Sequence, residues 1–184
     1  MNKYEAILLA LIEDPRYRRN LDWGWPRPGH PEGTVREHIG EVERNLELIR
    51  PKLSNLDYWK LRILAHTHDT FKGEAQPDVP IAAPSSHASL ARAFLASLCD
   101  DADLLAMVQY HDEPFALWRQ FVAKGRFNRE RFEILLVRIQ DWNLFFAFNI
   151  IDSCTDGKDR APLRWLFQQV DGRVESQFSA ADIL

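Results

Sequence analysis

The chain has 184 residues, of which 46% are apolar and 27% charged, so its composition is that of one soluble globular domain. Its net charge of −4 argues against a basic groove for long nucleic acids, and two cysteines (Cys99 and Cys154) exclude a disulfide scaffold or a structural zinc module. With no basic leader and no bilayer-length apolar run, we expect a single cytoplasmic domain over residues 1–184 without a membrane partner.

Helical periodicity runs along the whole chain, and no alternating strand pattern is present. A first amphipathic helix is expected over residues 3–13, and the Pro, Gly and Trp residues of 22–33 predict an irregular segment. Thr34 and Glu37 form a capping box that begins the next helix, whose apolar stripe is Val35, Ile39, Val42, Leu46 and Ile49.

The later elements follow from caps and prolines. Helices are expected from Ser54 or Asn55 to about Phe71, from Ser85 or Ser86 through Leu98, from Asp100 or Asp101 through His111, from Pro114 to about Lys124, from Arg131 to about Cys154, and after Pro162, with a proline-containing loop at 72–84. The fold class is therefore all-α, a bundle of about seven or eight helices.

Five of these helices end their core-facing stripe in a polar residue: His38, His68, His87, His111 and Asp152. Asp69 adds a carboxylate next to His68. A single histidine on an apolar face is usually a hydrogen-bonded core residue, but each unpaired buried polar group costs about 2–7 kcal/mol, and here five coincide. A divalent cation satisfies them all, and a His/Asp set without thiolates suits Fe, Mn, Co, Ni or Zn.

Other catalytic architectures are absent from the sequence. No histidine has a glutamate three positions before it, as di-iron carboxylate bundles require, and HExxH does not occur. The GxSxG elbow of serine hydrolases is missing as well.

The order of these residues resembles the HD-domain metal-dependent phosphohydrolases. The matching features are His38, the pair His68–Asp69 within HDTFK, HASLARAFLASL from His87, QYHDEP around His111, and the distant Asp152. The segment HPEGTVREH, from His30 to His38, resembles the start of the HD domain attached to bacterial tRNA nucleotidyltransferases. The resemblance covers about residues 30–156, two-thirds of the chain, and implies an HD-domain-like helical bundle.

The resemblance also implies a set of roles. His38, His68, Asp69 and Asp152 would hold one divalent ion, and Asp69 would bridge to a second ion held by His87 and His111. Two such ions activate water and bind phosphate oxygens. Asp69, Lys72 and His30 are then the catalytic candidates. Lys72 either contacts a phosphoryl oxygen or is a solvated loop lysine. His30 contacts the phosphate, protonates the leaving group, or only holds its own loop in place.

The implied activity is hydrolysis of a phosphomonoester or phosphodiester, with a small-molecule phosphate ester, a nucleotide or an RNA end as substrate. The alternatives are a regulatory HD module that binds a nucleotide without turnover and an HD-type binuclear-metal oxygenase. Lys72 beside the His-Asp pair favours phosphate chemistry over an oxygenase.

The sequence departs from the family pattern at two places. Thr70–Phe71 replaces the usual Ile-Gly or Leu-Gly, and Asp112 follows His111 where many binuclear members have histidine or glutamate. No GYP motif is present, and no nucleotidyltransferase sequence accompanies the domain.

Five further residues have two possible interpretations each. Asp156 is the substitute for Asp152 as a ligand, and His66 is expected to be structural because it lies about 160° around its helix from His68. Glu32 either supports the site or belongs to its loop. Trp23 and Trp25 either stack on a base or pack against the bundle.

Overall fold

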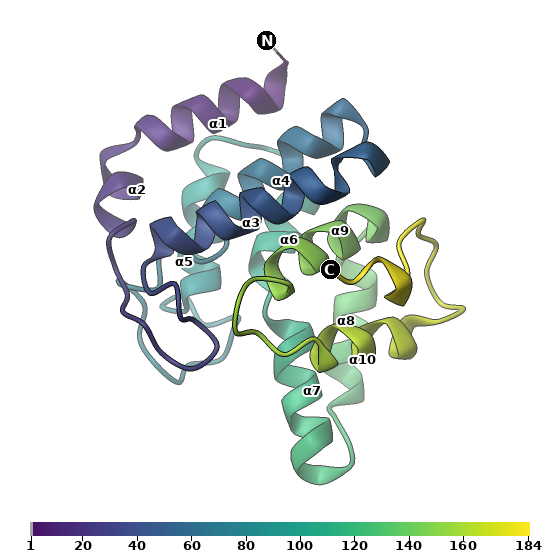
Figure 1. Ribbon diagram of the computed structural model, residues 1–184. Helices are drawn as coiled ribbons and strands as arrows, with labels where there is room; N and C mark the ends of the chain where they lie inside the picture. Colours follow the sequence, from purple (N-terminus) through teal and green to yellow (C-terminus); the bar gives the residue numbers. More distant parts are fainter. Residues whose placement is uncertain (1) are drawn as a thin grey trace.

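The computed structural model describes residues 2–184, and within that range it is all-α, without a strand (Figure 1). This confirms the expected fold class. The α-helices in chain order are α1 (Lys3–Glu13), α2 (Pro15–Asn20), α3 (Val35–Ile49), α4 (Asn55–Thr67), α5 (His87–Ala96), α6 (Ala102–Tyr110), α7 (Glu113–Lys124), α8 (Arg129–Arg138), α9 (Trp142–Ser153) and α10 (Ala161–Val170). Two short 3₁₀ turns, Arg50–Lys52 and Ala180–Asp182, complete the described elements.

Side-chain caps mark several of the helix starts, including the one expected at Thr34. Asn2 and Glu5 form a capping box on α1, and Thr34 and Glu37 form one on α3. Ser54, Ser86 and Asp101 accept backbone N–H groups at the starts of α4, α5 and α6. Each of these side chains pairs backbone donors that the first helical turn leaves free, so the helix begins at a defined residue.

The centre of the molecule is α9, which packs against α3, α4 and α10 (Figure 1). It is apolar on every side, and its rings Phe145, Phe146 and Phe148 are all buried. The stripe of α3 that includes Val42 and Leu46 is also buried. Because α3, α4 and α9 meet in this core, polar side chains at their ends come close together.

Two helices, α8 and α9, occupy the run from Arg131 to Cys154 where one helix was expected. The chain bends by 113° between them. Ile139 has an extended backbone, and the side chain of Asp141 caps α9 by accepting the N–H of Leu144 at 2.9 Å. The two carboxylate oxygens of Asp103 accept the N–H groups of Gln140 and Asp141, each at 2.9 Å. These bonds satisfy the backbone where the helix is interrupted.

Two other elements differ from the expectation. The helix from Asn55 ends at Thr67 instead of Phe71, and the segment that follows it continues as turns. The short helix α2 was not expected, although Asp14 caps it and Pro15 occupies its first position, which is a known start signal. The chain therefore contains more helices than the periodicity alone indicated.

No single helix within residues 2–184 has the length and apolar composition needed to cross a membrane. The bent pair α8 and α9 passes that test only when the two helices are taken together.

Candidate metal centre

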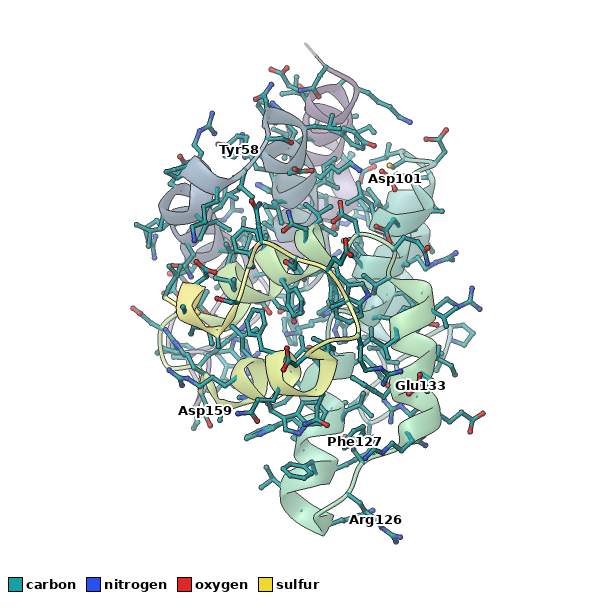
Figure 2. All side chains as sticks on the ribbon, turned by 90° about the vertical axis from the view of Figure 1, so that its right-hand side faces the viewer. Tyr58, Asp101, Arg126, Phe127, Glu133 and Asp159 are labelled. Carbon is teal, nitrogen blue, oxygen red and sulfur yellow. The ribbon has the colours of Figure 1, made fainter. Side chains whose placement is uncertain are left out.

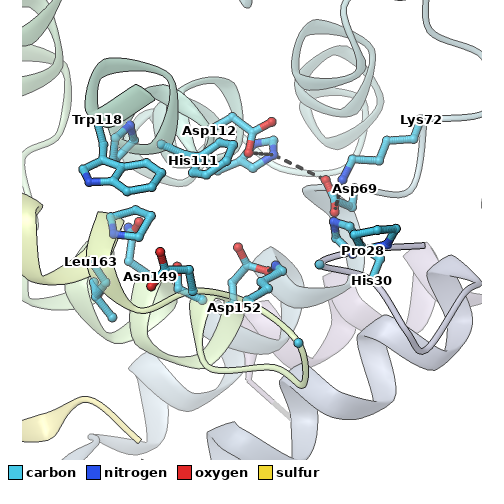
Figure 3. Close-up of a pocket in the computed structure, with 18 residues that line it drawn as sticks. Pro28, His30, Asp69, Lys72, His111, Asp112, Trp118, Asn149, Asp152 and Leu163 are labelled. Atoms are coloured by element: carbon cyan, nitrogen blue, oxygen red, sulfur yellow. Dashed lines mark hydrogen bonds and ion pairs between the residues drawn. The ribbon is translucent and has the colours of Figure 1, made fainter. Parts of the chain in front are cut away.

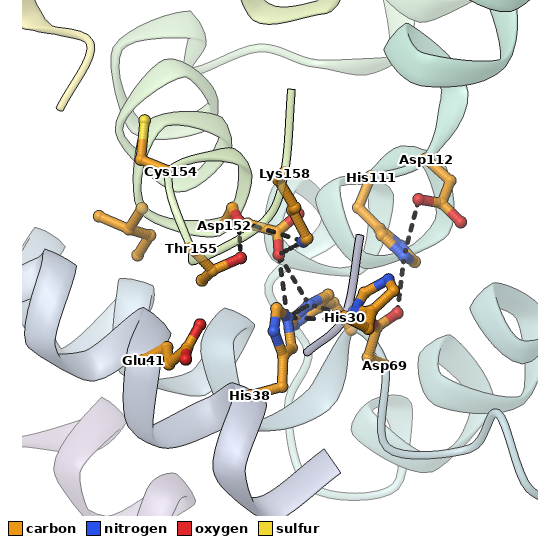
Figure 4. Close-up of polar contacts among 12 residues, drawn as sticks. His30, His38, Glu41, Asp69, His111, Asp112, Asp152, Cys154, Thr155 and Lys158 are labelled. Atoms are coloured by element: carbon orange, nitrogen blue, oxygen red, sulfur yellow. Dashed lines mark hydrogen bonds and ion pairs between the residues drawn. The ribbon is translucent and has the colours of Figure 1, made fainter. Parts of the chain in front are cut away.

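All six ligands expected from the sequence lie together where five helix ends meet. Figure 4 labels His38, Asp69, His111 and Asp152 among them. His38 lies near the start of α3, and Asp152 lies in the last turn of α9. His68 and Asp69 directly follow α4, His87 is the first residue of α5, and His111 directly follows α6. The side chains form two groups that share the carboxylate of Asp69.

The first group consists of His38, His68 and Asp152. The Nε2 atoms of the two histidines are 3.3 Å apart. Oδ1 of Asp152 lies 3.0 Å from Nε2 of His38 and 3.4 Å from Nε2 of His68. Both imidazoles are buried, so these atoms face one another away from water.

The second group consists of His87, His111 and Asp69. Nε2 of His87 and Nε2 of His111 are 3.2 Å apart. Oδ1 of Asp69 lies 3.7 Å from the former and 3.5 Å from the latter.

Asp69 stands between the two groups with one oxygen toward each. Oδ2 lies 3.8 Å from Nε2 of His38 and 3.6 Å from Nε2 of His68, whereas Oδ1 faces the second group. Oδ1 is buried and has no hydrogen-bond partner. A carboxylate in this position can bridge two cations, one on each oxygen.

The hydrogen bonds of the histidines direct lone pairs into the site. Nδ1 of His68 donates to the carbonyl oxygens of Leu64 and Ala65 at 3.0 and 3.1 Å, and Nδ1 of His111 donates to that of Val108 at 2.7 Å. In the neutral imidazole the proton on Nδ1 leaves Nε2 as an acceptor. Imidazole nitrogens and carboxylate oxygens therefore converge around Asp69 and Asp152, and this arrangement could hold a cation.

The residues present fit a divalent transition ion. The donors are imidazole nitrogens and carboxylate oxygens, and neither cysteine takes part. Imidazole with carboxylate suits Zn, Fe, Mn, Co or Ni. The carbonyl groups that fix the rings of His68 and His111 are the supporting bonds that metal-binding histidines usually make.

Glu32 supports this site from the loop before α3. Its Oε1 accepts a hydrogen bond from Nδ1 of His30 at 2.9 Å. The same oxygen lies 3.1 Å from Nδ1 of His38, but this contact does not have the geometry of a hydrogen bond. Burial would raise the pKa of Glu32, but the nearby imidazoles of His38 and His30 outweigh it and lower that pKa to about 2. Of the two readings that the sequence left open for Glu32, the structure favours the supporting one.

Two lysines neutralise the carboxylates of the site. Nζ of Lys72 lies 2.5 Å from Oδ2 of Asp69 (Figure 3), and Nζ of Lys158 lies 2.7 Å from Oδ1 of Asp152 (Figure 4). Burial would raise the pKa of both aspartates, but the nearby ammonium groups and imidazoles hold each pKa well below its usual range. Both aspartates are therefore ionised at neutral pH.

Lys158 was not expected from the sequence. It follows Gly157, whose φ of +73° suits glycine and where a Cβ would lie 2.8 Å from Cδ of Pro31. This close contact joins the loop after α9 to the loop that carries His30, and it places the lysine over Asp152. A lysine six residues after the terminal aspartate gives no recognisable motif.

Asp112 is a second residue that the sequence did not assign to the site. Its Oδ2 lies 3.2 Å from Nε2 of His87, and its Oδ1 lies 3.7 Å from Nε2 of His111. Burial would lower the pKa of His111, but the carboxylates of Asp112 and Asp69 outweigh it and raise that pKa to about 9. The only signal in the sequence was its adjacency to His111.

A cavity of about 540 Å³ opens over the site (Figure 3). Its polar side contains His30, Asp69, Lys72, Asp152 and Lys158. Its other side is lined by apolar and aromatic residues, namely Pro114, Phe115, Trp118, Pro162 and Leu163. This volume is within the range of small-molecule sites and can hold a nucleotide-sized ligand.

The remaining candidates lie outside the two ligand groups. His66 is bonded to the hydroxyl of Tyr17 at 2.5 Å and to Glu43 at 3.1 Å, which is a structural role as expected. Asp156 is exposed, so Asp152 is the aspartate at the site. Trp23 is half-buried and packs against Gly73, whereas Trp25 is 62% exposed.

No protein-family model, no curated protein and no solved structure matches this chain.

Proposed function

We propose that the protein is a divalent-metal-dependent phosphohydrolase that cleaves a phosphomonoester or phosphodiester. The observation that carries the proposal is the position of Asp69, whose two oxygens face two separate pairs of imidazole Nε2 atoms. Paired ions in such a site supply Lewis-acid stabilisation of phosphoryl oxygens and activation of water. The order of the ligands also resembles the HD-domain phosphohydrolases.

The lysines favour a phosphate ester over other substrates. Nζ of Lys72 and Nζ of Lys158 bond the carboxylates that would bind the ions. When cations neutralise these carboxylates, both ammonium groups are available to an anion in the cavity. Two positive side chains next to a cation site suit a multiply charged phosphoryl group better than they suit the activation of O₂. For this reason we prefer hydrolysis to the oxygenase alternative.

His30 is placed to handle a proton at the edge of the cavity. Its Nδ1 donates to Glu32, so Nε2 is an acceptor in the neutral ring. Burial lowers the pKa of His30, which favours that neutral form. The ring can therefore accept a hydrogen bond from a water or a substrate hydroxyl, and it protonates a leaving group only as the imidazolium.

The size of the cavity and its aromatic side suit a nucleotide or the end of an RNA strand. A small phosphate ester without a base would leave the aromatic side uncovered.

The proposal can be tested by phosphate release from a panel of nucleotides, bis-p-nitrophenyl phosphate and end-phosphorylated RNA, with Mn, Zn, Co, Ni or Fe added. We expect turnover that Asp69→Ala abolishes by orders of magnitude in kcat, because the shared ligand is lost. Asp156→Ala is the matched control, since this aspartate is exposed and lies outside the ligand groups.

Activity that survives Asp69→Ala would identify a contaminating phosphatase. Full metal loading without turnover of any ester would leave a binding module or an oxygenase as the function.

A further inference from the structure

A basic hairpin projects from the body of the molecule beside the cavity. It consists of α7, the turn at residues 125–128 and the start of α8 (Figures 1 and 2). Residues 115–129 contain four cationic side chains and no acidic one, in a chain whose net charge is −4. These side chains are Arg119, Lys124, Arg126 and Arg129, and all four are exposed.

None of the four cations forms an ion pair within residues 2–184, although Arg129 lies close enough to Glu133 to help lower the pKa of that carboxyl. Arg131, further along α8, shows the contrast, because it forms an ion pair with Glu113 at 2.5 Å. Two of the free guanidinium groups lie over aromatic rings instead. The guanidinium of Arg119 is 5.9 Å from the ring centroid of Phe115, and that of Arg129 is 4.9 Å from the ring centroid of Phe127.

The hairpin is held firmly against the body. The ring of Phe127 packs edge-on against Trp165 of α10 with centroids 5.0 Å apart, and Phe121 lies 6.0 Å from the same ring. Gly125, with φ +65°, ends α7 and donates its N–H to the carbonyl of Phe121 at 2.8 Å. The cationic groups therefore stand on a preformed support, which reduces the entropy lost when a ligand binds.

The same hairpin begins in the wall of the cavity. Phe115 and Trp118 line the cavity, and their rings stack with centroids 5.8 Å apart and planes at 27° (Figure 3). Arg119 is one turn of α7 from Phe115, and Arg126 lies in the turn just beyond the end of α7. The hairpin thus carries an aromatic platform at the site and four exposed cations along the rest of its length.

We propose that this hairpin binds the backbone of a single-stranded nucleic acid whose terminal phosphate enters the cavity. Aromatic platforms that stack bases, combined with cations that follow the backbone, are the general means of binding single strands. The inference rests on the proposed phosphohydrolase function, because it places the reacting phosphate beside Asp69. The helix α7 has 12 residues and is about 18 Å long, so only a short stretch of a strand can lie along the hairpin.

The net negative charge of the chain is consistent with this limited footprint. A protein that binds a long nucleic acid carries its positive charge over a whole face, whereas here it is confined to one hairpin. A short strand, or the end of a longer one, is therefore the class of ligand that we assign to the hairpin.

The test is fluorescence anisotropy with a labelled octauridylate that carries a terminal phosphate, measured at several salt concentrations. Three forms of the metal-loaded protein are compared: the wild type, the hairpin variant Arg119→Gln/Arg126→Gln, and the control variant Arg19→Gln/Arg92→Gln. The control removes the same charge from exposed arginines on α2 and α5. Equal melting curves for the three forms show that none is misfolded.

We expect the hairpin variant to lose at least tenfold in affinity for the octamer. The slope of log K against log salt should fall by about 1.4, because each phosphate contact contributes about 0.7 for single strands. The control should bind like the wild type, and uridine monophosphate should compete much more weakly than the octamer. Turnover of the mononucleotide should be unchanged in the control variant.

Three results would overturn the inference. They are an octamer that binds no tighter than the mononucleotide, equal losses in the hairpin and control variants, and binding of phosphatidylglycerol vesicles through the hairpin without binding of the octamer. The proposed function fails separately. Mononucleotide turnover without octamer selectivity refutes only the strand site, whereas octamer selectivity without any turnover refutes only the hydrolase.

Discussion

Addition of a divalent ion to the chelated protein should raise its melting temperature. The proposed ligands come from five helices that are distant in sequence, and the unfolded chain cannot present them together. An ion that binds only the folded state adds its binding free energy to the stability. The chelated protein should still fold, because Lys72 and Lys158 already pair with Asp69 and Asp152 at 2.5 and 2.7 Å.

The size of the shift follows from mass action. At a free ion concentration one hundred times the Kd, binding adds about 2.7 kcal/mol to the free energy of unfolding. For a chain of this length, each kcal/mol raises Tm by about 2–4 °C. Manganese or zinc at that concentration should therefore raise Tm by about 5–11 °C.

The assay is differential scanning calorimetry of protein stripped with a chelator and dialysed, without and with the added ion. Asp156→Ala should show the full shift, and Asp69→Ala should show little of it. If Tm is the same with and without ions whose binding elemental analysis has verified, the converging imidazoles are satisfied without a cation and the reasoning is wrong.

Three further predictions concern single side chains. Lys72→Ala should keep its metal content in elemental analysis but lose about 10²–10³ in kcat on a phosphate ester, because a charge that stabilises the transition state is removed. A loss of metal from this variant would contradict the prediction. Glu43 has its pKa lowered to about 2 by the hydrogen bond from His66 and then by Arg62, against the effect of burial. The contribution of ionised Glu43 to stability is therefore complete above pH 4.5 and is lost as the pH falls toward 2. The difference in Tm between the wild type and Glu43→Gln should shrink over that range, and a constant difference would refute this role of Glu43. Asp103→Ala should lower the free energy of unfolding, measured in urea, by about 2 kcal/mol, because the backbone between α8 and α9 loses two charged acceptors. Its metal content should be unchanged, and an unchanged midpoint of urea unfolding would contradict the prediction.

Local signals predicted four of the helix starts to within one residue because capping is a short-range effect. Thr34 with Glu37, Ser54, Ser86 and Asp101 each act on backbone groups within three residues. The ligands were predictable for a related reason. Each lies on or beside an inward helical stripe, and periodicity shows that position without knowledge of how the helices pack.

The break between α8 and α9 depends on a contact that no local pattern shows. Asp103 of α6 accepts the backbone N–H groups of Gln140 and Asp141, which lie nearly forty positions away in the chain. The run from Arg131 to Cys154 remains apolar on both sides of the break, so its periodicity favoured one helix. The signal that could have located the break was Asp141, a side chain that caps helices.

The residues missed at the site are held by loop contacts. Lys158 reaches Asp152 because Gly157 packs against Pro31, and Asp112 reaches His87 because the chain turns after α6. The number of ligands on the inward stripes was predictable, but the side chains that surround them depend on how the loops fold over the helix ends.

The most direct test of the two-ion site is a metal count combined with anomalous scattering on protein purified without a chelator. The account predicts two ions per chain, one contacting His38, His68 and Asp152, the other contacting His87 and His111, with Asp69 between them. A single ion, or none with the ammonium groups of Lys72 and Lys158 still on the carboxylates, would contradict it.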